Sequence, residues 1–339
     1  MGSPDGVSRR SHRFRRPFAL VAGVVAAVTI AGLLPSWWCG RDADAWFRGD
    51  PGRVRALAEE SVAFEAADDQ QRANGSSGEL TGMWGLIAHQ MTALGLAQIS
   101  LAHPDWRDRY APVATRAAAK TLLPEMRPVF TAAWYGEDGV TVPDSANGHA
   151  YLSYPALALG MARLVDPAFP PDLAARQDAL VTSYERRLLA SPTALIDTLP
   201  GEAYPTDVAA VAAAIAVHGR ATGADHSAVL AHWARQVRAV QIDPGTGLVL
   251  QRMGADGRAH DAPRASGTGL AAYFAGFADR ALASARAFGH RDVFTRIFRT
   301  TDLAGLPLRS GNRLRFANGG AIGNALLLAF LTSGPELAR

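Results

Sequence analysis

Apolar residues recur along most of the chain at the three- and four-residue spacing of helices, and alternation with a period of two is rare. Pro, Gly, Asn and Asp interrupt this pattern at intervals and mark where helices end. The predicted helices cover residues 52–68, 82–102, 105–122, 148–165, 172–190, 206–222, 225–240, 267–288, 290–299 and 319–332. The expected fold class is all-α.

Two kinds of helix alternate along the chain. Segments such as 172–189 carry Arg, Asp and Glu beside an apolar stripe, which is typical of outer helices that face solvent. Segments 82–101, 150–164, 208–217, 267–277 and 319–331 are nearly free of charge and rich in small residues, which indicates helices buried on all sides. The chain therefore loosely repeats one helical hairpin.

Such a repeat can close into a double ring of helices, an α/α toroid, or stack into an open solenoid. Inner helices without charge favour the toroid, because a solenoid leaves a concave face exposed to water. Each predicted inner helix follows a polar loop with Gly or Pro, and in a toroid these loops meet at one mouth. Capping of the helix starts is the alternative role of their polar residues. We expect a toroid of five to six hairpins over residues 51–339.

The N-terminal region has a different character. Five arginines and one aspartate stand in the first sixteen residues, so the rest of the chain carries a net charge of −1 out of +3 overall. Residues 18–38 are uncharged, apolar and long enough to span a membrane. We expect a basic cytoplasmic tail (1–17), a single-pass signal anchor (18–38), a linker (39–50) and an extracytoplasmic domain. Cleavage near residues 43–45 is the alternative.

Composition and missing motifs exclude several classes. A nearly neutral domain has no electrostatic field for a phosphate backbone, so nucleic acid is not an expected partner. Cys39 is the only cysteine, so no intrachain disulfide can form. The HExxH, GxSxG and Walker patterns do not occur. We predict no metal and no cofactor, since the acids of a hairpin expected at 243–257 lack calcium-loop spacing. The oligomeric state is left open.

Two carboxylates and a phenol stand together just before a charge-free helix. Glu202, Tyr204 and Asp207 follow a Pro-Gly turn, and two carboxyl groups in different environments can serve as general acid and base. His149, which begins another inner helix, titrates near neutral pH and could relay a proton. We therefore expect Asp207, Glu202, His149 and Tyr204 to be catalytic; capping by Asp207 and packing of His149 are the structural alternatives.

Further candidates lie in the same loops and first turns. Arg264 stands beside a Gly-rich helix start and suits a carboxylate or phosphate, or it pairs with a neighbouring loop acid. His89, inside the first inner helix, is a weaker candidate of the same kind as His149. The expected substrate-binding residues are Arg264, Asn147, Tyr151, Tyr154, Ser266, Tyr273 and Asn318.

Three strings resemble bacterial α/α-toroid proteins of the linalool dehydratase-isomerase kind. They are GEAYPTD at 201–207, DPGTGL at 243–248 and PRASGTG at 263–269 followed by Tyr273, and the resemblance spans roughly residues 75–335. It implies an inner ring around an apolar terpenol, with acid–base residues and cysteines at the pocket. Cys39 lies outside that span, so cysteine-dependent chemistry does not carry over. Toroid glycosidases and uronate-processing lyases share the architecture, and Glu202 and Asp207 fit their paired acids equally well.

These features predict a membrane-tethered, extracytoplasmic toroid enzyme of hydrolase, lyase or isomerase type. Carboxylate acid–base chemistry would act on a carbohydrate or isoprenoid alcohol, so the expected partners are a small-molecule or glycan substrate and the membrane. The alternative is a non-catalytic cell-envelope protein that binds or scaffolds a ligand. Carboxylates engaged only in capping and ion pairs would favour that alternative.

Overall fold

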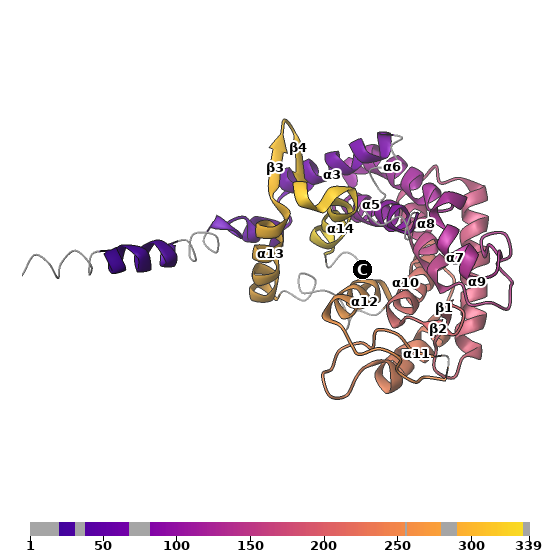
Figure 1. Ribbon diagram of the computed structural model, residues 1–339. Helices are drawn as coiled ribbons and strands as arrows, with labels where there is room; N and C mark the ends of the chain where they lie inside the picture. The colour runs from indigo at the N-terminus through magenta and orange to yellow at the C-terminus, as the bar shows by residue number, and fades with distance from the viewer. Residues whose placement is uncertain (1–19, 31–37, 68–81, 255, 279–289, 335–339) are drawn as a thin grey trace, which may run out of the picture.

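The computed structural model describes residues 20–30, 38–67, 82–254, 256–278 and 290–334, and all statements below concern these residues. They are mostly helical, as the apolar pattern predicts, with two short β-hairpins (Figure 1). The predicted helix over residues 267–288 is described only up to residue 278. The polar loop expected before the 82–102 helix, which contains residues 74–78, lies outside the described residues.

Five helices with little charge form the inner layer. They are α5 (Met83–Ala102), α8 (Ser153–Val165), α10 (Pro205–Thr222), α12 (Ala265–Ala278) and α14 (Gly320–Thr332). Side by side, they pack in the order α12, α10, α8, α5, α14, which gives the arc seen in Figure 1. Most residues of α5, α8 and α10 are buried, because helices without a polar face need neighbours on all sides.

Neighbouring inner helices run in the same direction. Gly95 of α5 lies against Leu328 of α14, and one turn further Thr332 donates a hydrogen bond to Gln98 (2.9 Å). Elsewhere in the layer, the hydroxyl of Thr206 at the start of α10 bonds the carbonyl of Gly267 in the first turn of α12 (3.2 Å). The first turns of these helices therefore lie together.

Charged helices cover the inner layer from outside. Helices α3 (Pro51–Ala66) and α6 (Arg107–Lys120) pack on α5, α9 (Pro171–Ala190) packs on α8 and α10, and α11 (Ser227–Gln236) packs on α9. The connections contain the helix α7 (Pro128–Ala133), the 3₁₀ turns η2 (Pro104–Trp106), η3 (Pro124–Met126), η4 (Ala150–Leu152) and η7 (Ala317–Gly319), and the π-helical turn η5 (Val237–Gln241). Apolar residues of both layers form one main core.

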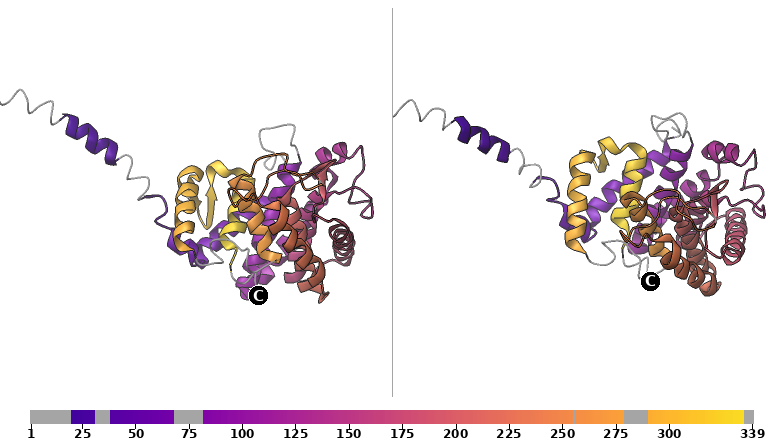
Figure 2. Two further views of the ribbon diagram at one scale, coloured as in Figure 1. Left: turned by 90° about the horizontal axis from the view of Figure 1, so that it is seen from below. Right: turned by 60° about the horizontal axis from the view of Figure 1, so that its bottom comes forward.

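The segment expected to be a linker is folded onto the domain. It contains α2 (Ala43–Phe47), which packs on α13 (Arg291–Gly305), a helix longer than its predicted span. Phe47 contacts Phe294 edge to face, with ring centroids 5.4 Å apart, and the N–H of Gly40 donates to Asp302 (3.1 Å). Figure 2 shows α13 on the side from which residues 20–30 project. Residues 39–50 were too short and too polar to be predicted as a helix, but these contacts hold them against α13.

Both regular hairpins were missed by the sequence pattern. β1 (Asp197–Leu199) pairs with β2 (Glu202–Ala203), and β3 (Pro307–Ser310) pairs with β4 (Arg313–Phe316), all antiparallel. The hairpin predicted at 243–257 is present only as isolated antiparallel bridges: Ile242 pairs with Val249, and Met253 pairs with Ala259 and with Ala203 of β2. The side chain of Asp243 accepts the N–H of Thr246 (2.8 Å) in the turn between Ile242 and Val249.

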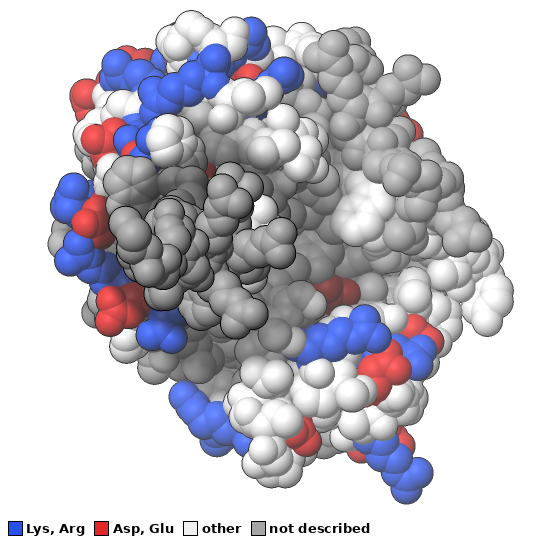
Figure 3. All heavy atoms as spheres, turned by 60° about the vertical axis from the view of Figure 1, so that its left-hand side comes forward, with Lys and Arg blue, Asp and Glu red and all other residues white. Residues whose placement is uncertain are grey.

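The N-terminal helix is only partly described. Residues 20–30 are helical and exposed throughout, whereas the rest of the predicted span, apart from Trp38, lies outside the described residues. Among the described helices, none combines the length and apolar character that crossing a membrane requires. Among the described residues on the face seen in Figure 3, basic and acidic side chains are interspersed.

Candidate functional site

Asp207 lies in the first turn of α10, at the centre of the predicted carboxylate cluster. Its Oδ1 accepts a hydrogen bond from the phenol of Tyr154 in the first turn of α8, and its Oδ2 accepts one from the Thr198 hydroxyl of β1 (2.6 Å). Asp207 does not cap α10: the N-cap position belongs to Tyr204, and no side chain caps it. Burial raises the pKa of Asp207, while the two hydrogen bonds lower it.

Glu202 of β2 forms a second, more exposed group. Oε1 of Glu202 pairs with Arg252 (2.6 Å), while Oε2 accepts from the Tyr204 phenol (2.9 Å). Asp261 contacts the same guanidinium at 3.3 Å, so two carboxylates share one arginine. Partial burial and the bond to Glu202 raise the pKa of Tyr204 to about 12. Tyr204 therefore stays protonated at neutral pH.

His149 is held beside Glu137 in the loop before α8. Its Nε2 lies 2.6 Å from Oε1 of Glu137, which also accepts from Asn147 (3.0 Å) and from the hydroxyl of Ser145. Burial lowers the pKa of His149, so a neutral imidazole that donates through Nε2 fits this geometry. The hydrogen bond from His149, followed by those from Ser145 and Asn147, lowers the pKa of Glu137 to about 2.

Trp134 connects the His149 and Asp207 groups. Its indole N–H donates to the backbone carbonyl of Thr198 (3.0 Å), and its ring lies 4.9 Å from that of His149. Thr198 in turn bonds Asp207. Contacts through Trp134 and Thr198 thus connect His149 to Asp207. The predicted residues Asp207, Glu202 and Tyr204 do not line the cavities described below.

Three predicted binding residues have local structural contacts. The ring of Tyr151 is fully buried and stacks on Phe130, with centroids 4.0 Å apart. Asn318 donates to the carbonyl of Ala304 near the end of α13 (2.8 Å). Arg264 is exposed, and its backbone carbonyl accepts two bonds from Thr268, while no ion pair with a loop acid is formed within the described residues.

Two other predicted residues, Ser266 and Tyr273, line a common cavity. This cavity has a volume of about 490 Å³ and lies between α12, α13 and α14. Its remaining walls are mainly apolar: Ala265, Gly269, Leu270, Phe294, Ile297, Phe298, Thr301, Leu326, Leu327, Phe330, Leu331 and Ser333. The hydroxyl of Tyr273 accepts a hydrogen bond from Gln98 (2.6 Å), and its ring meets Phe330 edge to face. The cavity has the size of a small-ligand site.

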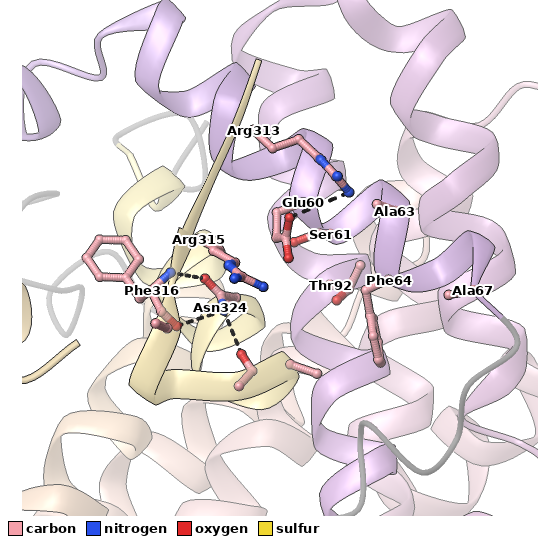
Figure 4. Close-up of a pocket in the computed structure, with 13 residues that line it drawn as sticks. Glu60, Ser61, Ala63, Phe64, Ala67, Thr92, Arg313, Arg315, Phe316 and Asn324 are labelled. Carbon is pink, nitrogen blue, oxygen red and sulfur yellow. Dashed lines mark hydrogen bonds and ion pairs between the residues drawn. The ribbon is translucent and has the colours of Figure 1, made fainter. Parts of the chain in front are cut away.

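A larger and more polar cavity was not predicted. It has a volume of about 730 Å³ and lies between α3, α5, β4 and the start of α14 (Figure 4). Its polar side chains include Glu60, Thr92, Arg313 and Arg315. The short alternation of polar and apolar residues in β4 was its only signal in the sequence, and four residues are too few to stand out.

A buried group of charges lies next to this polar cavity. Oε1 of Glu65 is 2.7 Å from Nδ1 of His89, and its Oε2 is 3.3 Å from Nζ of Lys120, the only lysine of the chain. Phe64 lines the cavity and stacks on His89. A buried carboxylate requires such partners, so these contacts explain His89 structurally.

The chain was compared with protein-family models and with curated proteins. No family model matches the chain, and no curated protein matches it significantly. In the described parts of the chain, no three His, Cys, Asp or Glu side chains are grouped as metal ligands. Function is therefore inferred from the cavities and polar groups themselves.

Proposed function

We propose that the inner helices close into an α/α toroid, that residues 18–38 tether it to the membrane with the domain outside the cytoplasm, and that it takes up an isoprenoid-type alcohol. The parallel inner helices and the outer layer support the toroid. The uncharged 18–38 segment after an arginine-rich tail supports the tether. The resemblance to linalool dehydratase-isomerase-like proteins over residues 75–335 agrees with the toroid and with an isoprenoid-type alcohol.

The apolar cavity between α12, α13 and α14 is the observation that carries the ligand class. Its walls are mostly hydrocarbon, with a few hydroxyls such as those of Ser266 and Tyr273. A sugar needs hydrogen-bond partners for many hydroxyls, and burying them against these walls would leave most unpaired. An alcohol with one hydroxyl and a branched hydrocarbon body matches the site better.

For a reaction of lyase or isomerase type, the proposed acid is Asp207 and the proposed base is Glu202. Neither residue lines the apolar cavity, so this reaction requires the alcohol to reach beyond the cavity to the first turn of α10. Loss of water from an alcohol requires an acid that protonates the leaving hydroxyl and a base that removes a proton from a neighbouring carbon. Burial raises the pKa of Asp207, which favours its protonated form, and the more exposed Glu202 pairs with Arg252 (2.6 Å). Hydrolysis of a carbohydrate would use the same two groups.

A non-catalytic binding protein is the second candidate. The carboxyl oxygens of Asp207 and Glu202 all accept hydrogen bonds from protein groups, and neither residue lines the apolar cavity. Carboxylates engaged in this way hold the β1–β2 hairpin against α8 and α10 without any reaction. This engagement favours binding alone.

Separate assays of binding and turnover test the proposal. The detergent-solubilised full chain would be titrated with a ten-carbon terpenol and, in parallel, a neutral oligosaccharide, and products would be followed by chromatography. Gly269→Phe should abolish terpenol binding, because Gly269 lines the cavity and a Cβ there meets no atom within 4 Å. Gly323→Phe, at an equally uncrowded glycine that does not line the cavity, is the matched control.

Each outcome decides between the candidates. Terpenol binding that Gly269→Phe removes, with turnover that Asp207→Asn removes, supports the enzyme. Binding without turnover in the unaltered chain supports the binding protein. Absence of terpenol binding, or binding that both glycine variants leave unchanged, would overturn the proposed ligand class, and turnover of the oligosaccharide would replace it.

A further inference from the structure

We propose that the polar cavity between α3, α5, β4 and α14 binds a small phosphate-bearing molecule. This inference is independent of the terpenol proposal, because the two cavities share no lining residue. Arg313 and Arg315 also line an adjoining recess of about 270 Å³, so the two spaces form one groove beside the hairpin. Figure 4 shows lining residues from the hairpin, α3 and α5, with Arg315 and Thr92 on facing sides.

The register of the β3–β4 hairpin directs two arginines to the cavity. Leu308 pairs with Arg315 and Ser310 with Arg313, so these four residues share one face of the hairpin. The alternate residues of β4, Leu314 and Phe316, are buried on the other face. Because side chains alternate between the two faces of a strand, Arg313 and Arg315 lie on the same face of the hairpin.

Of the two arginines that line the cavity, Arg313 has an ion-pair partner and Arg315 has none among the described residues. Glu60 lies 3.9 Å from Arg313, and this is the only ion pair among the cavity residues that the structure describes. Arg315 extends from β4 toward the wall formed by Thr92 and Phe64, without a hydrogen bond or ion pair within the described chain (Figure 4). An arginine in this situation is suited to a bidentate contact with an oxyanion.

Thr92 provides an independent indication of a ligand. It is fully buried and lines the cavity, and its Oγ1 has no hydrogen-bond partner. A buried hydroxyl without a hydrogen-bond partner destabilises the folded state, so native structures rarely retain one without a role. A phosphate oxygen in the cavity would accept the hydrogen bond that Thr92 otherwise lacks.

The start of α14 completes the proposed site. Gly320 and Ala321, its first two residues, line the cavity, and a helix N-terminus presents free N–H groups and a partial positive charge. Asn324 fixes this end relative to the hairpin: its Oδ1 accepts the N–H of Phe316 (2.7 Å), and its Nδ2 donates to the carbonyl of Gly320 (2.6 Å). The donors are therefore held in place before a ligand arrives.

The size and walls of the cavity indicate more than a bare ion. A volume of about 730 Å³ exceeds that of one phosphate group, and Phe64 and several alanines form an apolar part of the wall. A phosphate would lie between Arg315, Thr92 and the α14 start, with an organic body against Phe64. The phosphate can belong to a soluble metabolite or to a lipid headgroup, since both offer the same chemistry.

Calorimetry on the detergent-solubilised full chain tests the site with three probes: inorganic phosphate, pyrophosphate and dihexanoyl phosphatidylglycerol below its micelle concentration. Arg315→Ala should weaken binding about tenfold or more, the effect expected for one charge-assisted hydrogen bond. Glu60→Gln should strengthen binding, because it removes a negative charge from the cavity. Arg309→Ala is the matched control, since Arg309 shares the hairpin but lies on its other face.

Thr92→Val separates a ligand contact from a structural role. It keeps the shape of the side chain and removes an unpaired hydroxyl, so the unfolding temperature should stay equal or rise while phosphate binding weakens severalfold. Binding of phosphate or pyrophosphate that depends on Arg315 supports a soluble ligand, and Arg315-dependent binding of the lipid alone supports a headgroup. Absence of binding, or equal affinity in Arg315→Ala, Thr92→Val and Arg309→Ala, overturns the proposal.

Discussion

The phenol of Tyr154 donates a hydrogen bond to Oδ1 of Asp207, which joins the first turns of α8 and α10. The second carboxyl oxygen accepts from Thr198 of β1, so one side chain connects two inner helices and a hairpin. Asp207 is buried, and Tyr154 is also buried among apolar neighbours such as Phe274. The acid that the sequence marks for chemistry is therefore also a structural junction.

Removal of the Tyr154 hydroxyl should weaken this junction. Tyr154→Phe leaves a buried carboxyl oxygen without its partner, and we expect the free energy of unfolding to fall by about 1–3 kcal/mol. Urea denaturation followed by circular dichroism would measure it. Tyr135→Phe, at an exposed position, should have almost no effect. An equal loss in both variants would argue against a structural role for the Tyr154–Asp207 bond.

The ionisation of Asp207 should make stability depend on pH. Burial raises its folded-state pKa above 3.8, so its stabilising contribution is complete below pH 3.8 and is lost as the pH rises through the folded-state pKa. Asp207→Asn cannot ionise. The stability of the unaltered chain relative to Asp207→Asn should therefore decrease as the pH rises from 3.5 to about 8. A difference that grows with pH would show that the hydrogen bonds from Thr198 and Tyr154 outweigh burial.

Close packing of α5 against α14 should depend on one glycine. A Cβ at Gly95 would lie 2.6 Å from Cγ of Leu328 and 3.1 Å from the N of Ala329, so Gly95→Ala forces the helices apart. We expect a loss of about 1–3 kcal/mol in unfolding free energy, as in overpacked cores. Gly323→Ala on α14 meets no atom within 4 Å and should instead stabilise by about 0.5–1 kcal/mol. Stability raised by both variants would contradict the packing.

The fold class could be predicted because the inner helices have an unambiguous pattern. Segments such as 208–217 contain no charge, and this character depends on local sequence alone. The two hairpins could not be predicted in the same way. β1 and β2 contain three and two residues, and what holds them is the contact of Thr198 with Asp207 and of Ala203 with Met253. Such contacts depend on the folded chain.

In the candidate site, too, local features could be predicted from the sequence and long-range contacts could not. Glu202, Tyr204 and Asp207 stand within six residues of one another, so they could be picked out as a group in the sequence, but the partners that each contacts could not be predicted. Arg252 reaches Glu202 from fifty residues away. The polar cavity joins Thr92 to Arg315 across more than two hundred residues, and neither residue lies in a recognisable motif. In both sites, residues far apart in the sequence come together only in the folded chain, so local sequence patterns could not predict them.

The loop before α8 should lose stability in acid through Glu137. Hydrogen bonds from His149, Ser145 and Asn147 lower its pKa to about 2 from an ordinary 4.5. Its contribution to stability is therefore present above pH 4.5 and is lost as the pH falls toward 2. Glu137→Gln should lie below the unaltered chain in unfolding temperature at pH 6, with a gap that narrows steadily toward pH 2. Scanning calorimetry across this range would measure the gap.

Tyr184→Phe is the control for this pH dependence. It removes a hydrogen bond from the Tyr184 phenol to the backbone carbonyl of His149 (2.9 Å), in the same loop, without removing an acid. Burial raises the pKa of Tyr184 well above 10, so this side chain stays neutral throughout the scan. Its stability gap to the unaltered chain should change little between pH 6 and pH 2. If Glu137→Gln gives an equally constant gap, the carboxylate of Glu137 does not stabilise the loop through its charge.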